Sequence, residues 1–331
     1  MSSADTLAAA PPRRRLGTIG NQGALLLLLV AMEAGFALVQ PRIVSLGNVL
    51  NVLHQASYLL VLTIAQTLVI LTRGFDLSLG TTVSAVSVAS ALVLTGFGDD
   101  PVWWVLVLGI AAGLAMAGCV GLFNGVLIAG IGVNPFIATL ASLNICLGLA
   151  TTISGGKPVF GVPDAFSTLM NDGTIFGVQV ALWIAGAVLL FAWFVLTRTV
   201  FGRAVYLLGS NPRAATVAGL PARRFLGSAY LICSLLGGLG ALMLTARTGS
   251  GEPNLGGSLM LQSIAAAVIG GTSLRGGTGG VAAAVLGTFF VTMLSNGMDL
   301  LRISGYVQMI ALGLVVILAT ALDFLRGQRA N

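Results

Sequence analysis

Charged residues are scarce in this chain: only 8% of its 331 residues are Asp, Glu, Lys or Arg, whereas about 25% is usual in a soluble domain. The single histidine, His54, leaves little material for histidine-based catalysis or for a histidine metal site. The three cysteines, Cys119, Cys146 and Cys233, are odd in number and lie in apolar segments, which argues against a disulfide framework. Apolar residues make up 56% of the chain and the mean hydropathy is +1.00, which indicates a protein dissolved in a lipid bilayer.

Long apolar segments are abundant. A bilayer core about 30 Å thick needs roughly 20 apolar residues for each helical crossing. We therefore predict an all-α bundle of about ten transmembrane helices, with eight or nine as the alternative because the eighth segment is short. The segments are 22–40, 56–72, 81–97, 102–130, 136–154, 178–197, 225–246, 259–271, 281–297 and 304–323. Interrupted helices and an inverted repeat are the architecture we expect.

Arginine placement supports this topology. With a cytoplasmic amino terminus, four basic residues fall outside (Arg42, Lys157, Arg247 and Arg302), whereas twelve arginines fall inside, as the positive-inside rule expects. The twelve are Arg13, Arg14, Arg15, Arg73, Arg198, Arg203, Arg213, Arg223, Arg224, Arg275, Arg326 and Arg329.

The same topology divides the chain. We expect a disordered cytoplasmic tail at 1–20, a single transmembrane domain at 21–325 and a short cytoplasmic tail at 326–331. The net charge of +6 then reflects arginines on the inner membrane face, and we predict no nucleic-acid partner.

The sequence offers little for catalysis. The segment "SGGKP" at 154–158 is not the G-x-x-x-x-G-K-[ST] phosphate loop. We therefore prefer a transport subunit that has no catalytic centre, no metal and no bound cofactor. An ion-coupled secondary transporter is the weaker alternative, because such proteins usually show paired intramembrane carboxylates and here only Glu33 lies deep in an apolar run.

Three stretches join glycine or proline to polar residues at the end of a span, as the broken helices of transporters do. In "LTRGFDLSLG" at 71–80 we expect Gly74 to end the second span in a left-handed conformation and Asp76 or Ser78 to cap the third. We also expect Arg73 to compensate the charge of Asp76. A tight turn with no transport role fits equally well. The residues of these break motifs are Gly74, Asp76, Ser78, Gly80, Asn134, Pro135, Gly270 and Gly271.

The cytoplasmic connector at 198–224 contains a short helix with clear ends. Asn211 suits its N-cap, Pro212 its first position and Gly219 the position after its end. A helix of under two turns is unstable alone in water, so we expect it to dock onto another protein. An interfacial segment lying on anionic headgroups is the alternative. The residues of the expected contact are Arg203, Asn211, Pro212, Arg213, Ala214, Ala215 and Gly219.

Four blocks in the same order resemble the permease subunits of ribose-type ABC importers, within the branched-chain amino acid and ribose permease superfamily. The blocks are "TRGFDLSLGT" (72–81), "GLFNGVLIAGIGVNPFIATLASLNICLGL" (121–149), Gly202 followed by "RAVYLLGSNPRAATVAGL" (203–220), and "SIAAAVIGGTSLRGGTGG" (263–280). The resemblance covers about residues 45–323. It implies a path for a monosaccharide or related polyol across a bacterial inner membrane.

The resemblance also implies partners. These are a second permease subunit, identical or not, a periplasmic sugar-binding protein, and a cytoplasmic ATPase that carries ATP and magnesium and contacts residues 203–224. Departures from the family pattern are Arg73 in place of Gly, Phe75 in place of Ile, and Met260 and Gln262 where many members have an acidic residue. A less acidic solute path follows, and a branched-chain amino acid or nucleoside permease of the same superfamily stays open as the alternative.

Several polar residues within the spans are candidates for lining the solute path. Each could equally be a hydrogen-bonding packing residue between helices. The candidates are Asn124, Thr139, Asn144, Gln262 and Asn296.

Overall fold

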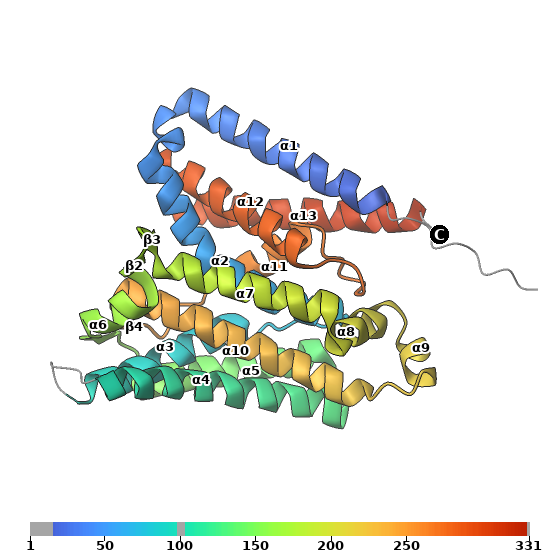
Figure 1. Ribbon diagram of the computed structural model, residues 1–331, viewed down its shortest axis with the longest axis horizontal. Coiled ribbons are helices and arrows are strands. Elements are labelled where there is room, and N and C mark those ends of the chain that lie inside the picture. The colour runs from blue at the N-terminus through green and yellow to red at the C-terminus, as the bar shows by residue number, and fades with distance from the viewer. Residues whose placement is uncertain (1–15, 98–102, 330–331) are drawn as a thin grey trace, which may run out of the picture.

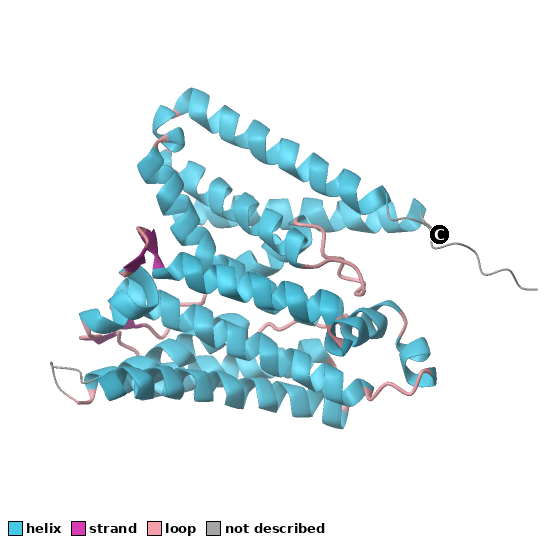
Figure 2. Cartoon of the chain, viewed as in Figure 1, coloured by secondary structure: helices cyan, strands magenta, loops and turns pink. Residues whose placement is uncertain are grey.

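The computed structural model describes residues 16–97 and 103–329, with side chains over 23–97 and 103–321, and is almost entirely helical (Figure 2). The predicted all-α fold is confirmed, and each of the ten predicted spans coincides with a helix. These helices are α1 (Leu16–Val39), α2 (Leu46–Leu71), α3 (Leu79–Thr95), α4 (Trp103–Gly125), α5 (Pro135–Ser154), α7 (Val180–Arg198), α10 (Ala222–Thr248), α11 (Leu259–Ile269), α12 (Val281–Leu300) and α13 (Gly305–Arg329).

Length and composition qualify six described helices as membrane spans: α2, α5, α7, α10, α12, and α4 together with its π-helical continuation η2 (Val126–Ile131). The apolar parts of α1, α3, α11 and α13 are shorter. Two boundaries differ clearly from prediction. α2 begins ten residues before position 56, because Ser45 accepts a hydrogen bond from the Asn48 N–H and caps it there. α1 begins at Leu16, inside the predicted tail, whose residues 1–15 lie outside the described residues.

Both described ends of the chain lie on one side of the molecule. In Figure 1 the start of α1 and the end of α13 are at the right, on the same side of the molecule as α8 (Val200–Ser210) and α9 (Pro212–Val217). The opposite side carries the short elements η1 (Pro41–Val44), α6 (Asp164–Ser167), η3 (Thr168–Asp172) and the strands β1 (Val159–Phe160), β2 (Thr174–Ile175), β3 (Val178–Gln179) and β4 (Ser250–Gly251). We name the side with α8 and α9 the inner side and the opposite side the outer side.

Two small antiparallel pairs lie on the outer side. β1 pairs with β4, with Val159 opposite Gly251, and β2 pairs with β3, with Thr174 opposite Gln179. The pair β1–β4 joins the segment after α5 to the segment after α10. It therefore ties together two parts of the chain that are about ninety residues apart.

The helices form two halves with the same packing plan, α2–α5 and α10–α13. In the first half α4 packs on α3 and on α10 of the other half, while in the second α12 packs on α11 and on α2 of the other half. α5 packs on α3 as α13 packs on α11. Because α2 starts on the outer side and α10 on the inner side (Figure 1), the arrangement is that of the predicted inverted repeat.

The distribution of side chains is that of a membrane protein. Large apolar side chains are exposed on the outward faces of the helices, for example Leu190, Phe194 and Ile317, whereas Thr63, Ser84 and Ser234 are buried between helices. Small and hydroxyl-bearing residues at helix contacts allow close backbone approach where lipid removes the hydrophobic drive for association.

Candidate functional site

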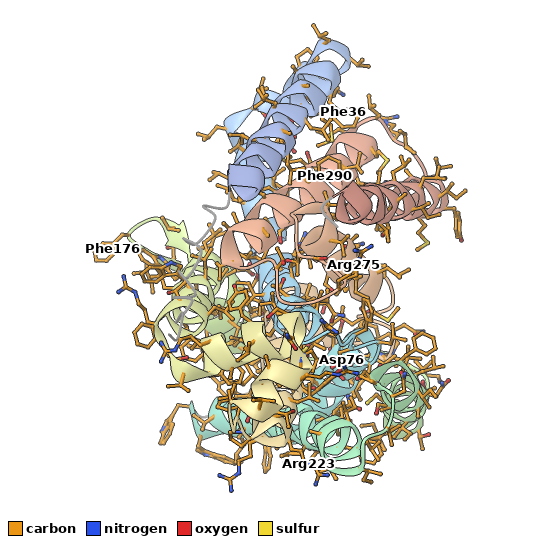
Figure 3. All side chains as sticks on the ribbon, turned by 90° about the vertical axis from the view of Figure 1, so that its right-hand side faces the viewer. Phe36, Asp76, Phe176, Arg223, Arg275 and Phe290 are labelled. Carbon is orange, nitrogen blue, oxygen red and sulfur yellow. The ribbon has the colours of Figure 1, made fainter. Side chains whose placement is uncertain are left out.

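The break between α2 and α3 is built around a buried carboxylate. Asp76 is fully buried, and its Oδ1 accepts hydrogen bonds from the backbone N–H of Ser78 at 2.9 Å and from the Ser78 hydroxyl. The Cys233 thiol of α10 lies 3.8 Å from the other carboxylate oxygen. Asp76 thus holds the turn that precedes α3. Ser78 occupies the N-cap position of α3 but makes no side-chain capping bond to the helix, so the predicted cap by Asp76 or Ser78 is wrong. Figure 3 shows it among the helices of the lower part of that view.

One predicted path residue, Asn124, belongs to this buried network, whereas a second, Thr139, does not. The Asn124 amide of α4 donates to the Ser78 hydroxyl at 2.9 Å, and its oxygen accepts from the Ser142 hydroxyl of α5 at 2.5 Å. Thr139 is also buried and donates to the carbonyl of Pro135 at 2.8 Å. The network therefore connects the helix break to α4 and α5, and Asn124 lies inside it.

The break between α10 and α11, residues 249–258, finds its hydrogen-bond partners on another helix. Its backbone N–H groups at Glu252 and Gly256 donate to the hydroxyls of Ser87 and Ser84 on α3, at 3.2 and 3.1 Å. At its end the backbone meets the start of α3 directly. A methyl group on Gly256 would lie 1.8 Å from the carbonyl oxygen of Gly80, so only glycine fits this crossing. Gly80, predicted as a break residue, lies inside α3 and serves this contact.

A crevice with both apolar and polar lining residues opens between α11, α12 and α13 of the second half and α2 of the first. It consists of two adjoining cavities of about 470 and 220 Å³ that share Gln262, Ser295 and Gln308. We call it the outer crevice. Its volume is in the range of roughly 300–1,000 Å³ typical of small-molecule sites. Its polar lining is Gln55, Ser258, Gln262, Thr292, Ser295, Asp299 and Gln308.

The polar groups of the outer crevice are partly available for a ligand. The Thr292 hydroxyl is buried and finds no partner among the described residues. The Gln308 amide donates to Asp299 at 2.6 Å and to the carbonyl of Ile303 at 3.0 Å, and the Gln262 amide donates to Ser258 at 3.3 Å. Amides and hydroxyls of this kind can exchange such bonds for the hydroxyl groups of an uncharged solute.

The five predicted path residues are not brought together. Gln262 lines the outer crevice, whereas Asn124 and Thr139 lie in the first half. Asn296 forms a reciprocal amide pair with Asn48 of α2, at 2.9 and 3.0 Å. Asn144 is on the exposed face of α5 and donates to the carbonyl of Leu140 at 3.0 Å. Their role in transport stays a prediction.

Six further lining residues of the outer crevice were missed at the sequence level: Gln55, Ser258, Thr292, Ser295, Asp299 and Gln308. Gln55 and Gln308 are 253 positions apart and come from α2 and α13. The one available signal is the spacing of Thr292, Ser295 and Asp299, which repeat every three to four residues and so share one face of α12. It indicates a polar face and does not identify its partners.

The inner side carries the capped short helix as predicted. The Asn211 side chain accepts from the N–H of Ala214 at 3.0 Å, Pro212 occupies the first position of α9, and Gly219 has φ 69°. Leu220 N–H bonds to the carbonyl of Ala215 at 3.1 Å, which completes a glycine C-cap. Ala215 is buried, whereas Arg213 and Val217 are exposed.

One part of the connector was predicted wrongly. Residues 200–210, treated as loop, form α8, capped by the Thr199 hydroxyl, which accepts from the N–H of Gly202 at 3.3 Å. Arg203 lies on this helix. Figure 3 looks onto the inner side, with Arg223 at its lower edge and Arg275 nearer its middle. The inner side is therefore arginine-bearing.

Two further expectations about the first break are wrong. Gly74 does not take the left-handed conformation at the end of α2; Arg73 does, with φ 67°. Arg73 also does not compensate Asp76, because its guanidinium donates to the carbonyls of Gly209 and Ser210 while Asp76 bonds Ser78. The backbone turns one residue earlier than predicted, and this carries the Arg73 side chain away from the buried carboxylate.

The remaining break residues lie at or next to helix ends. The Asn134 side chain accepts from the N–H of Phe136 at 2.9 Å, with Pro135 in the first position of α5. Gly270 caps the end of α11 and Gly271 has φ 108°. Among the residues that the structure describes, no three His, Cys, Asp or Glu side chains are grouped so that they could hold a metal ion.

Comparison with known proteins covers almost the whole chain. The chain is 34% identical over 304 residues to the ribose import permease protein RbsC of Escherichia coli K12. The aligned residues cover 90% of this chain and 92% of that protein. It is 32% identical over 323 residues to the galactose/methyl galactoside import permease protein MglC of Haemophilus influenzae, covering 92% and 95%. With RbsC of Bacillus subtilis the identity is 33% over 290 residues, covering 87% and 88%. No solved structure matches the chain. Residues 48–320 match the family model of branched-chain amino acid transport system permease components, and the chain belongs to this permease family.

Proposed function

We propose that this chain is the membrane-spanning permease subunit of an ABC importer for a monosaccharide or a related polyol. The observation that carries the proposal is the similarity to ribose and galactose import permeases over about nine-tenths of both chains. The inverted repeat and the outer crevice between its helices support transport, because such repeats place solute sites at helix interruptions. In this proposal ATP and magnesium bind to a partner subunit.

The inner side is proposed as the cytoplasmic face. α9 presents exposed Val217 and Arg213, and Val217 is 89% exposed, which is costly for an apolar side chain in water and favourable in a protein contact. The positive-inside rule puts the arginines of α8, α9 and the start of α10 on the same face. We therefore assign the ATPase contact to residues 203–224, and the amino and carboxyl ends to the cytoplasm of a bacterial cell.

The outer side then faces the periplasm. A binding protein delivers the solute there, and the outer crevice lies along the solute's route, between two permease subunits that together form the pore. Gln262 and Gln308 supply amide groups suited to sugar hydroxyls.

The name of the family favours a second candidate, a branched-chain amino acid permease. The lining favours the sugar. An amino acid needs partners for both its ammonium and its carboxylate, whereas Asp299 is the one charged side chain among the described lining residues, and it is bonded to Gln308.

The test uses the complete complex in vesicles, with ATPase and binding protein, and compares uptake of labelled ribose, galactose and leucine. We expect ATP-driven accumulation of a sugar and none of leucine. Gln262→Leu should lower sugar uptake about tenfold while ATP hydrolysis stimulated by the binding protein persists, and Met309→Leu in the same crevice is the matched control. Accumulation of leucine alone would contradict the proposal.

A further inference from the structure

The end of α2 is an unusual place for an arginine side chain. The N–H of Arg73 bonds to the carbonyl of Ile70 at 2.9 Å and that of Gly74 to the carbonyl of Val69 at 3.1 Å, the pattern of a helix end whose next residue is left-handed. Glycine usually occupies that position because a side chain is strained there. Here Arg73 occupies it, with φ 67°. The left-handed turn points its side chain at α8.

The guanidinium of Arg73 binds the carboxyl end of α8. Its Nε donates to the carbonyl of Gly209 and its Nη2 to that of Ser210 at 2.9 Å. These are the last two carbonyls of the helix, where free acceptors and the helix dipole attract a cation. The fork of two N–H groups fixes the direction of α8 as well as its distance, which a single ammonium group cannot do.

Backbone contacts enclose the same place. The N–H of Gly277 donates to the carbonyl of Leu71 at 2.9 Å, so the loop after α11 also joins the end of α2. A methyl group on Gly209 would lie 1.8 Å from that carbonyl oxygen, and one on Gly276 would lie 2.5 Å from Cγ of Arg73. We call the set Arg73, Gly209, Ser210, Gly276 and Gly277 the inner junction. Three segments distant in sequence meet there without room for a shift.

The inner junction stands between two features already described. On one side, Ser210 is followed by Asn211, the N-cap of α9, the exposed helix assigned to the ATPase contact. On the other side, Arg73 is three residues from Asp76, whose network runs through Ser78 and Asn124 to α5. A displacement of α9 would therefore move the α2–α3 break through the Arg73 side chain, which bonds the carbonyls of Gly209 and Ser210.

We infer that Arg73 is a positioning residue for energy coupling: it makes α8 and the α2–α3 break move together when the ATPase moves α9. The inference rests on the proposed function. A purely structural Arg73 would be needed for assembly of the complex. A coupling Arg73 would not be: its loss should leave assembly and ATP hydrolysis intact and reduce transport.

The chain supplies a matched control. Arg302 follows α12 in the same left-handed conformation, with φ 58°, and with the same pair of bonds, from Arg302 N–H to Asp299 and from Ile303 N–H to Met298, each 2.9 Å. It lies on the outer side, away from α8. Arg73→Gly and Arg302→Gly therefore relieve the same backbone strain at opposite ends of the molecule.

The experiment measures solute imported per ATP hydrolysed by the complete complex in vesicles, with ribose and galactose as probes. For Arg73→Gly we expect normal assembly, ATP hydrolysis that persists, and a ratio at least fivefold lower. Arg73→Lys, which retains the charge but not the fork, should give an intermediate ratio, and Arg302→Gly should leave it unchanged. If Arg73→Gly fails to assemble, the ratio for Arg73→Lys decides.

Unchanged ratios for Arg73→Gly and Arg73→Lys would overturn the inference, as would an equal fall for Arg302→Gly. Failure of the proposed function is distinguishable, because then the unaltered complex itself would import neither sugar at the expense of ATP.

Discussion

The two halves of this permease share a packing plan but differ in their polar chemistry. In the first half, the α2–α3 break contains its own buried carboxylate, and Asp76, Ser78, Asn124 and Ser142 are closed into one network. In the second half, the backbone N–H groups of the α10–α11 break donate to serine hydroxyls of α3, and α11 borders the open outer crevice.

The difference indicates that the two halves have different mechanical properties. A closed network of buried hydrogen bonds is rigid, because each partner loses its bond if another moves. A crevice with unpaired and exchangeable groups can accept a solute. Under the proposed function, the first half would transmit force from the inner side and the second would bind the solute.

The contact between the halves should give the largest effect. Gly256→Ala puts a methyl group 1.8 Å from the backbone oxygen of Gly80, and neither backbone segment can yield without moving a helix start. We expect loss of folded permease, measured as the monodisperse fraction in detergent. Gly257→Ala, with its nearest atom 3.6 Å away, is the matched control and should express normally. Normal folding of the Gly256 variant would contradict this close crossing of α3 and the α10–α11 break.

The network of the first half should come next. Asp76→Ala leaves the N–H and the hydroxyl of Ser78 buried without their acceptor, at a cost of about 1–3 kcal/mol for each unpaired group. Asp76→Asn retains one oxygen acceptor and should lose less. Thermal unfolding in detergent measures both, and equal stability of Asp76→Ala and the unaltered chain would show that the network is not closed.

The asparagines at corresponding places in α4 and α12 compare the halves directly. Asn124→Ala should destabilise by about 2 kcal/mol because both Ser78 and Ser142 lose a buried partner. Asn296→Ala should cost about 1 kcal/mol, since its partner Asn48 keeps a bond to the carbonyl of Ile43 at 2.9 Å. Unfolding in a graded detergent series measures the stability of both variants. If Asn296→Ala proved the more destabilising, the proposed contrast between a closed first half and an open second half would fail.

The smallest effect is expected at α9. Asn211→Ala removes the side-chain cap, worth about 1 kcal/mol, and should weaken ATPase binding about fivefold because the helix must then be ordered on contact. Thr216→Ala, inside the same helix, is the control. If both variants and the unaltered chain bound the ATPase equally well, the Asn211 cap would have no role in ATPase binding.

The features that could be predicted from the sequence are those that local rules decide, and prediction from a single segment has limits. Apolar segment length placed ten helices, and cap residues placed the ends of α9. Prediction failed where distant segments meet. α8 was missed because its apolar face is buried by neighbouring helices rather than by lipid. Arg73 was assigned to Asp76 by proximity in sequence, whereas its partners lie 136 and 137 positions away. The outer crevice depends on four helices together, so Gln262 was the one lining residue that a motif could indicate.

The most direct test of the central claim, that the inner side is the cytoplasmic face bound by an ATPase, is labelling of a Val217→Cys variant. Cys119, the exposed native cysteine, is replaced by serine first. We predict that an impermeant thiol reagent labels Val217→Cys only from the cytoplasmic face, and that bound ATPase blocks the labelling. Labelling from the periplasmic face, or labelling that the ATPase does not affect, would contradict the account.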